Sequence, residues 1–168
     1  MACGAFTAGY ILIDFLRLKN NAVKSVFIII FGSLIRRKEL RSFTGGTYLL
    51  LALLLCMLVF DKEVFLAAAA FLIIGDTMAA ITGQFLGRVR IFRKSLEGTL
   101  SNFLSCVLIA LLLSKLPVPP TGVSLPLKIG VIGAICASIV ELLPFRINDN
   151  VAIPVVAGTV MQIGKIVM

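Results

Sequence analysis

The sequence predicts an all-α integral membrane protein: a polytopic transmembrane helix bundle of about five to six spans plus a short interfacial helix. Hydrophobic residues make up 60% of the 168-residue chain, and the mean hydropathy is +1.09. A soluble domain of this size needs more polar surface than that. The apolar residues also fall in long runs separated by short charged loops, as in membrane-spanning helices. We therefore expect a single integral-membrane domain over residues 1–168.

The first half of the chain is predicted to hold a short apolar helix, an interfacial helix and two spans. Residues 2–16 contain Asp14 and reach only about two thirds of the way across a roughly 30 Å hydrocarbon core. Residues 23–35 are too short to span and are flanked by charge, which indicates an interfacial or re-entrant helix. Spans are predicted at 47–60 and 64–83, and the short turn between them makes the two antiparallel neighbours.

Three further spans are predicted in the second half, at residues 96–113, 125–143 and 151–168. The proline-rich loop 117–120 separates the first two, because proline cannot continue a helix. The sequence Asn-Asp-Asn at 148–150 precedes the third and supplies residue types that cap a helix N-terminus.

The cations predict the orientation of the chain in the membrane. With alternating spans, the loops 17–46, 84–95 and 144–150 share one side and hold twelve lysines and arginines, against four elsewhere. Cytoplasmic loops of membrane proteins carry the excess of these residues, so the basic loops are predicted to be cytoplasmic. The formal charge of +8 then indicates topology and phosphate binding, and we expect no nucleic-acid partner.

Residues 75–99 are the strongest candidate for a functional site. Asp76 lies within a predicted span, where a carboxylate costs roughly 2.5–3.5 kcal/mol on insertion scales and is usually kept for function. Small residues recur every fourth position from the same point: Gly75, Ala79, Gly83 and Gly87. Such a stripe lets another helix approach closely, and packing alone is one explanation for these glycines.

Cations and acids follow the stripe in close succession: Arg88, Arg90, Arg93, Lys94 and Glu97. Glu141 and Asp149 lie at helix ends on the same predicted face, and such a face suits a metal-bound polyphosphate. Mg²⁺ takes one or two carboxylates plus phosphate oxygens and water, and phosphates bind cations and helix N-termini. Backbone N–H groups at 44–46 and at the helix starts near Ser95 and Asn150 suit phosphate. The alternative is that the cations only set topology and the acids only pair with them.

Residue types that are absent from the sequence, or that occur only singly, limit the reactions that the chain could catalyse. The chain has no histidine, which excludes a phosphohistidine intermediate and a histidine base and leaves proton transfer and metal binding to the eight carboxylates. The four cysteines are isolated in separate apolar segments, so we expect them to be small buried side chains. No basic segment precedes the first apolar run, so no cleaved signal peptide is expected.

Three motifs in this order resemble the CTP-dependent lipid kinases: dolichol and polyprenol kinases, phytol kinase and the CTP-dependent diacylglycerol kinase. They are RRKELRSFTGGTYLLLALLL, GDTMAAITGQFLGR with RKSLEGT, and ELLPFRINDNVAIP, which together cover about residues 36–158. The resemblance implies transfer of the γ-phosphoryl group of CTP to the hydroxyl of polyprenol, dolichol or diacylglycerol at the cytoplasmic face, with Mg²⁺ as cofactor. The chain departs from the family pattern at its N-terminus, where members commonly carry a further span led by a basic, histidine-containing element.

The resemblance also implies roles for particular residues. Asp76 would be a metal ligand or base, Lys94 and Glu97 would handle phosphate and metal, and Asp149 would be a further metal ligand. The implied nucleotide- and phosphate-binding residues are Thr44, Gly45, Gly83, Gly87, Arg88, Ser95, Asp149 and Asn150. Glu39 and Glu141 are additional acids of the candidate site.

Two other functions share features with the sequence. The skeleton GD…G…GR…K-S/T-x-E-G also resembles the phosphatidate cytidylyltransferases, in which the lipid phosphate attacks the α-phosphorus of CTP. Their longer signature includes a histidine, which this chain lacks, so the kinase is favoured. A small transporter would place charges near the midplane and show an internal repeat, and the sequence shows neither. CTP and a lipid alcohol are the expected partners, and homodimerisation is left open.

Overall fold

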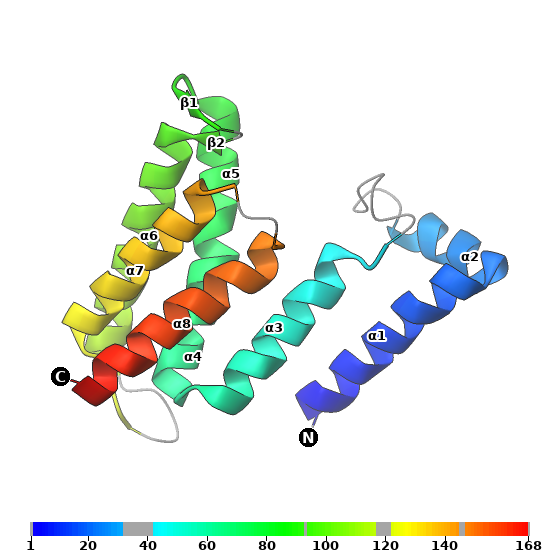
Figure 1. Cartoon of the computed structure of the whole chain (residues 1–168), viewed down its shortest axis with the longest axis horizontal. Coiled ribbons are helices and arrows are strands. Elements are labelled where there is room, and N and C mark those ends of the chain that lie inside the picture. The colour runs from blue at the N-terminus through cyan, green and yellow to red at the C-terminus, as the bar shows by residue number, and fades with distance from the viewer. Residues whose placement is uncertain (1, 32–41, 93, 117–121, 145–146, 168) are drawn as a thin grey trace. The chain divides into compact units, whose positions relative to one another are not determined.

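The computed structural model describes residues 2–31, 42–92, 94–116, 122–144 and 147–167. The described residues are almost entirely helical, as the sequence predicts (Figure 1). Within these described ranges, three helices are long and apolar enough to cross a membrane: Lys62–Phe85, Leu96–Lys115 and Asp149–Val167. The chain divides into two compact units, Met1–Leu54 and Leu55–Met168. The number of spans and the single domain stay predictions, and each unit is described by itself.

The first unit contains α1 (Ala2–Lys19), α2 (Asn21–Phe31) and most of α3 (Gly45–Val59). The helices predicted at 2–16 and 23–35 correspond to α1 and α2, although residues 32–35 lie outside the described part. α3 begins two residues before the predicted 47, because Thr44 starts the helix. The Thr47 N–H lies 3.1 Å from the Thr44 carbonyl oxygen, so the two glycines expected in a loop form the first turn of α3.

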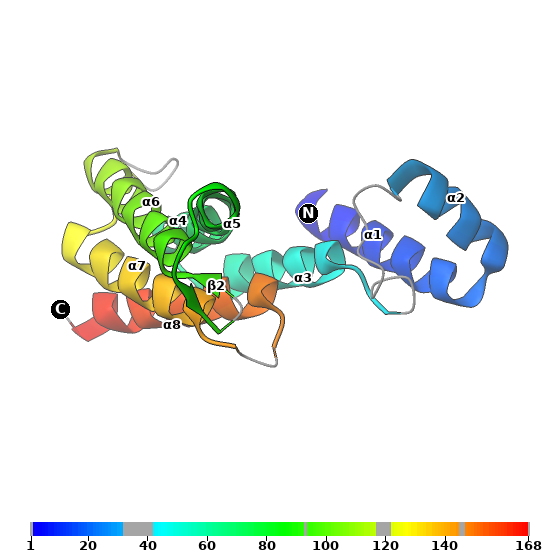
Figure 2. The same cartoon turned by 90° about the horizontal axis from the view of Figure 1, so that it is seen from above.

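The second unit is a helical bundle closed at one end by a small hairpin. Its elements are α4 (Lys62–Ala70), the π-helical turn η2 (Phe71–Gly75), α5 (Asp76–Phe85), β1 (Arg90–Ile91), β2 (Lys94–Ser95), α6 (Leu96–Lys115), α7 (Leu127–Leu142) and α8 (Asp149–Val167). α4, η2 and α5 form one continuous helical stretch. Successive helices from α5 to α8 pack side by side, and α4 contacts α8 (Figure 2). The bounds of α6, α7 and α8 confirm the predicted helices to within two residues.

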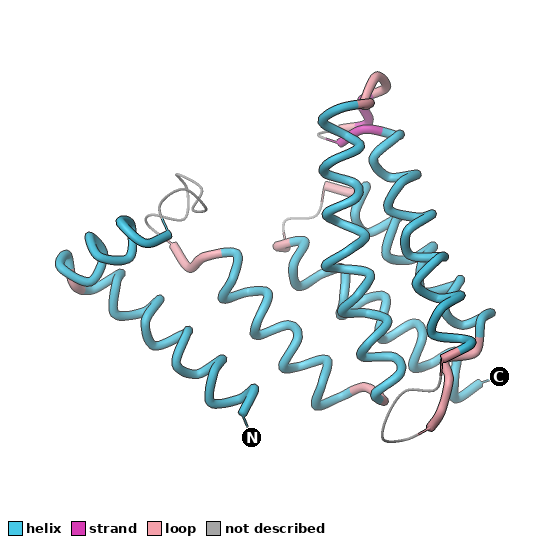
Figure 3. Tube along the Cα trace, turned by 180° about the vertical axis from the view of Figure 1, so that it is seen from behind, coloured by secondary structure: helices cyan, strands magenta, loops and turns pink. Residues whose placement is uncertain are grey.

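Two local features depart from the predicted pattern. The helix predicted at 64–83 contains a π-helical turn directly before Asp76. The loop expected at 84–95 contains an antiparallel hairpin, with Arg90 opposite Ser95 and Ile91 opposite Lys94. These two strands are the only extended ladder in the described residues (Figure 3). Strands of two residues show no alternation of polar and apolar positions, so sequence periodicity cannot reveal them.

Small residues hold α5 against α6, which confirms that the predicted stripe is a packing face. A Cβ atom on Gly75 would lie 2.8 Å from the Sγ atom of Cys106, and one on Gly98 would lie 2.8 Å from the carbonyl oxygen of Ala79. Side chains at these points would therefore push the helices apart. Gly87, predicted on the same helical face, instead lies beyond the last residue of α5, Phe85.

A cluster of polar side chains closes the end of the bundle opposite the hairpin. The Nζ atom of Lys165, near the end of α8, lies 2.6 Å from Oδ2 of Asp61 and also pairs with the buried Glu63. Gln162 donates to Asp61 Oδ2 (3.2 Å) and accepts the Asp61 N–H (3.1 Å). The hydrogen bonds from Lys165 and Gln162 hold the pKa of Asp61 below its usual value. This cluster ties α8 to the start of α4.

The packing of α7 against α6 and α8 predicts opposite effects for two glycine-to-alanine substitutions, Gly130 in α7 and Gly164 in α8. A Cβ at Gly130 would lie 2.7 Å from the Ala110 Cβ, whereas at Gly164 the nearest atom is 3.9 Å away, on Ile129. Overpacking costs roughly 1–3 kcal/mol, and alanine gains up to about 1 kcal/mol over glycine in a helix. We expect Gly130→Ala to lower the thermal unfolding midpoint in detergent and Gly164→Ala to keep or raise it. Equal midpoints for the two variants would contradict this packing.

Candidate functional site

Lys94 of β2 joins carboxylates from two helices. Its Nζ atom lies 3.1 Å from Oε1 of Glu141 at the end of α7 and 2.9 Å from Oδ2 of Asp149 at the start of α8. Partial burial lowers the Lys94 pKa, but the Asp149 hydrogen bond and the Glu141 charge outweigh burial and raise it above its usual value. The structure thus brings three of the predicted site residues to one end of the second unit, and we call them the Lys94 cluster.

The Glu141 carboxylate is held by a further side chain that the sequence analysis did not assign. Glu141 is only 3% exposed, and a buried carboxylate is stable only when it is paired and hydrogen-bonded. The Thr99 hydroxyl donates to Oε2 of Glu141 (3.0 Å). Thr99 lies one helical turn after Ser95 in the motif KSLEGT, and that spacing is the signal that could have identified it.

Ser95 and Gly83 form the junction of α5, β2 and α6. The Ser95 Oγ accepts the N–H of Gly98 (3.1 Å) and caps the N-terminus of α6, where an uncapped N–H would otherwise lack a partner. A Cβ on Gly83 would lie 2.9 Å from this same oxygen. Both residues, expected to bind phosphate, therefore have a packing or capping role here, and their contact with phosphate stays a prediction.

The two carboxylate oxygens of Glu97 differ in their hydrogen bonding. Its Oε1 accepts the N–H of Val89 (3.1 Å), which ties the base of the hairpin to α6. Its Oε2 is buried and has no hydrogen-bond partner. Among the described residues, no three acidic or thiol side chains lie close enough together to hold a metal ion by themselves. A Mg²⁺ ion that keeps water and phosphate oxygens needs only one or two protein carboxylates, so magnesium binding by Glu97 stays a prediction.

Asp76 lies deeper in the bundle than the Lys94 cluster. It is the first residue of α5 and half-buried, seven residues before Gly83, so it sits about 10 Å further from the hairpin along the helix axis. The preceding π-helical turn is a feature often found at functional sites. The neighbouring Gly75 packs on Asn102, a buried amide that accepts the Ser138 hydroxyl (3.0 Å). Gly75, the residue before Asp76, therefore packs on a polar stretch of the bundle interior.

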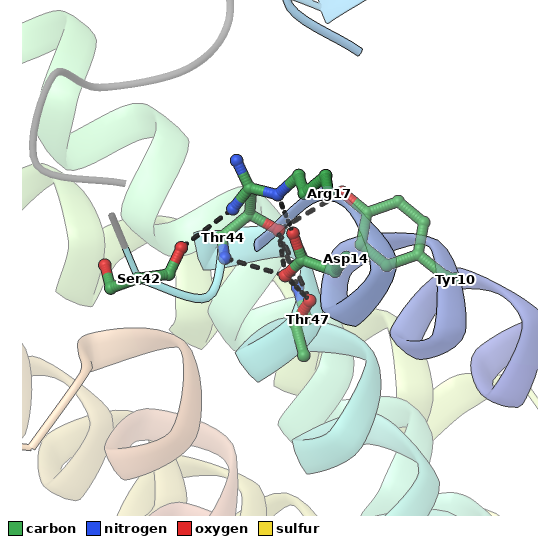
Figure 4. A network of polar contacts seen from close by, with 6 residues as sticks. All are labelled: Tyr10, Asp14, Arg17, Ser42, Thr44 and Thr47. Carbon is green, nitrogen blue, oxygen red and sulfur yellow. Dashed lines mark hydrogen bonds and ion pairs between the residues drawn. The ribbon is translucent and has the colours of Figure 1, made fainter. Parts of the chain in front are cut away.

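Thr44 and Gly45 belong to the first unit. In that unit the carboxylate of Asp14, a residue of α1, contacts the N-terminus of α3 (Figure 4). Oδ2 of Asp14 accepts the Thr44 N–H (2.9 Å) and hydroxyl (3.1 Å), and the Thr47 hydroxyl as well. Arg17 pairs with Asp14 and donates to the Ser42 carbonyl oxygen (2.8 Å). A helix N-terminus attracts anions, and here the anion is a carboxylate of the same unit. Sequence reasoning missed this role of Asp14.

The other predicted site residues are distributed as follows. Asp149 and Asn150 open α8, and the Asn150 N–H donates to Oδ1 of the capping Asn148 (3.1 Å). Arg88 is exposed next to Val89, and Gly87 packs against the Gly83 carbonyl oxygen. Glu39 and Arg93 lie outside the described residues.

No protein-family model and no solved structure matches the chain. The chain is similar to an uncharacterized protein of Rickettsia prowazekii, with 29% identity over 147 residues that cover 84% of this chain and 70% of that protein. It is also similar to CTP-dependent diacylglycerol kinase 1 of Eremothecium gossypii, with 29% identity over 171 residues that cover 90% of this chain and 54% of the kinase. The chain thus spans about half the length of that kinase.

The Asp14–Arg17 pair predicts strong coupling between two substitutions. Both side chains are almost fully buried, and breaking a buried ion pair costs roughly 3–5 kcal/mol because it leaves one charge uncompensated. We expect Asp14→Asn and Arg17→Met each to lower thermal stability and to speed proteolysis of the first unit. The double variant should lose clearly less stability than the sum of the single losses. Strictly additive losses would mean that the pair does not hold the unit together.

Proposed function

We propose that the chain is a lipid kinase that transfers the γ-phosphoryl group of CTP to the hydroxyl of a membrane lipid alcohol. The observation that carries this proposal is the Lys94 cluster, in which motif residues 55 positions apart in the sequence meet at one end of a membrane-type bundle. The similarity to a protein named CTP-dependent diacylglycerol kinase supports the same reaction class. Phosphoryl transfer requires mainly positioning and cations, and this site provides both without a histidine.

The proposed phosphate site lies around the hairpin and the start of α6. Lys94 is held by its two carboxylates with part of its side chain exposed (28%), so its fixed ammonium group can meet a phosphate oxygen. Arg88 is exposed nearby and stays the predicted second cation. Mg²⁺ bound with the nucleotide would neutralise phosphate charge. Because Mg²⁺ needs only one or two protein carboxylates, Glu97 and Asp149 are the proposed ligands. Asp76, predicted as a third ligand, is not included, since no three such side chains of the described residues lie together.

The proposed acceptor hydroxyl lies near Asp76. In the reaction, the lipid hydroxyl oxygen forms a bond to the γ-phosphorus of CTP while the bond from that phosphorus to the β-bridging oxygen breaks. CDP leaves, and the hydroxyl proton passes to a carboxylate, for which Asp76 is our candidate. The excess of lysines and arginines in the loops on the side of the hairpin supports a site that faces the cytoplasm.

Isotope position in the product tests the proposed reaction. We expect label from the γ-phosphate of CTP to appear in the lipid, with release of CDP, when the purified chain is given lipid alcohols in mixed micelles. Diacylglycerol is the first acceptor to test, because the similar kinase bears that name, followed by polyprenol and phytol, with ATP as the comparison nucleotide. Phosphatidic acid should be inert. Label from the α-phosphate on phosphatidic acid, with pyrophosphate release, would instead show a cytidylyltransferase.

Asp76 is predicted to be essential for turnover and dispensable for folding. Asp76→Asn should lower kcat by at least about 10²-fold, the scale of a lost acid–base group, while the neutral amide inserts more easily than the carboxylate. Asp61→Asn is the matched control, since Asp61 lies in the ion-pair cluster at the opposite end of the bundle, and its turnover should stay near normal. Near-normal turnover of folded Asp76→Asn would assign Asp76 a packing role.

A further inference from the structure

The hairpin between α5 and α6 exposes large apolar side chains beside a cation. Phe85, Leu86, Val89 and Phe92 are 81%, 65%, 52% and 67% exposed, and Arg90 on β1 is exposed as well. The hairpin lies at the end of the bundle where α5 ends and α6 begins (Figure 1), the end that also carries the Lys94 cluster. Lys94 itself is paired with Glu141 and Asp149. These apolar side chains do not pack into the bundle core. Because they lie at the end of a helix, they also do not reach the centre of a bilayer.

Phe92 also has an unusual backbone conformation. Its φ angle is +56°, and it is the only residue other than glycine with positive φ among the described residues. This region is readily adopted by glycine and asparagine and is unfavourable for a bulky side chain. The phenylalanine is 67% exposed, so packing within the protein does not compensate for the strain. A strained residue of this kind points to a role outside the fold itself.

We propose that residues 85–92 form an interfacial anchor that inserts into the headgroup layer of an anionic phospholipid membrane. Aromatic side chains are favoured at the membrane–water interface, and a nearby arginine is attracted to anionic lipid phosphates within a Debye length of the surface. In this arrangement Phe92 enters the upper acyl region and Arg90 contacts lipid phosphate. The anchor fixes the depth of the hairpin, and this inference does not depend on the kinase reaction.

The chain contains no tryptophan, so Phe92→Trp places a single fluorescent reporter in the proposed anchor. The full chain would be reconstituted in vesicles of phosphatidylcholine with and without phosphatidylglycerol, using lipids brominated near the headgroup or at the chain ends. We expect blue-shifted emission and several-fold stronger quenching by the headgroup-proximal bromines. Leu104→Trp is the control: it lies in the middle of α6 and is 60% exposed, so chain-end bromines should quench it more strongly.

Two further variants separate anchoring from folding. Phe92→Asn suits the positive φ angle, so its thermal stability in detergent should equal or exceed that of the unsubstituted chain. In the same background, a Phe85→Trp reporter should lose quenching by headgroup-proximal bromines. We expect phosphatidylglycerol to strengthen the quenching of Phe92→Trp. The substitution Arg90→Gln in the Phe92→Trp chain should remove that increase.

Three results would overturn the anchor. One is emission from Phe92→Trp typical of a water-exposed indole and insensitive to brominated lipids. Another is a loss of thermal stability in Phe92→Asn, which would make Phe92 a structural residue. The third is a shift of Phe92→Trp emission on adding CTP in detergent without any dependence on lipid composition, which would assign the hairpin to the nucleotide instead.

Discussion

The ammonium group of Lys94, held between Glu141 and Asp149, is the interaction on which the second unit depends. Glu141 is almost fully buried, and a buried carboxylate that loses its cation is strongly destabilising. β2, the end of α7 and the start of α8 must therefore meet at one point. They can do so only because α6, which follows β2 directly, lies close to α5 on one side and α7 on the other. The small residues along these contacts allow that approach.

The sequence was sufficient to predict the helices of the second unit and the packing face of α5, because both leave a periodic signal. The apolar runs predict α6, α7 and α8 to within two residues, and a small residue at every fourth position from Gly75 to Gly83 marks a close helix contact. Two-residue strands and a single π-helical turn leave no such signal. The motif spacing marks Thr99 as one turn after Ser95, but its partner Glu141 lies 42 residues away, and periodicity does not indicate that contact.

The start of α3 shows how a sequence motif can indicate the right chemistry and the wrong partner. Thr44 and the two glycines after it are predicted as a loop whose N–H groups bind an anion, and the structure shows them instead at a helix N-terminus that does bind one. The anion in contact with it is Asp14, 30 residues earlier in the chain. Sequence reasoning treated Asp14 only as a charge in an apolar run, because nothing in the chain links it to Thr44. Any phosphate at this point would first have to displace a buried carboxylate, so the nucleotide site is better sought in the second unit.

The charges of the Lys94 cluster limit how that site can work. One ammonium and two carboxylates give the cluster a formal charge of −1 (+1 − 2) at neutral pH, so by itself it repels a polyphosphate. Its carboxylates are therefore better understood as holding Lys94 in place, with their surplus negative charge available to a cation. A metal-bound nucleotide would reduce the repulsion, and Glu97, whose buried Oε2 has no hydrogen-bond partner, lies in the first turn of the neighbouring α6. The acids of the chain thus fall into two groups: those paired with Lys94 organise the polar end of the bundle, whereas Asp76 lies about 10 Å from Gly83 along α5, away from that end.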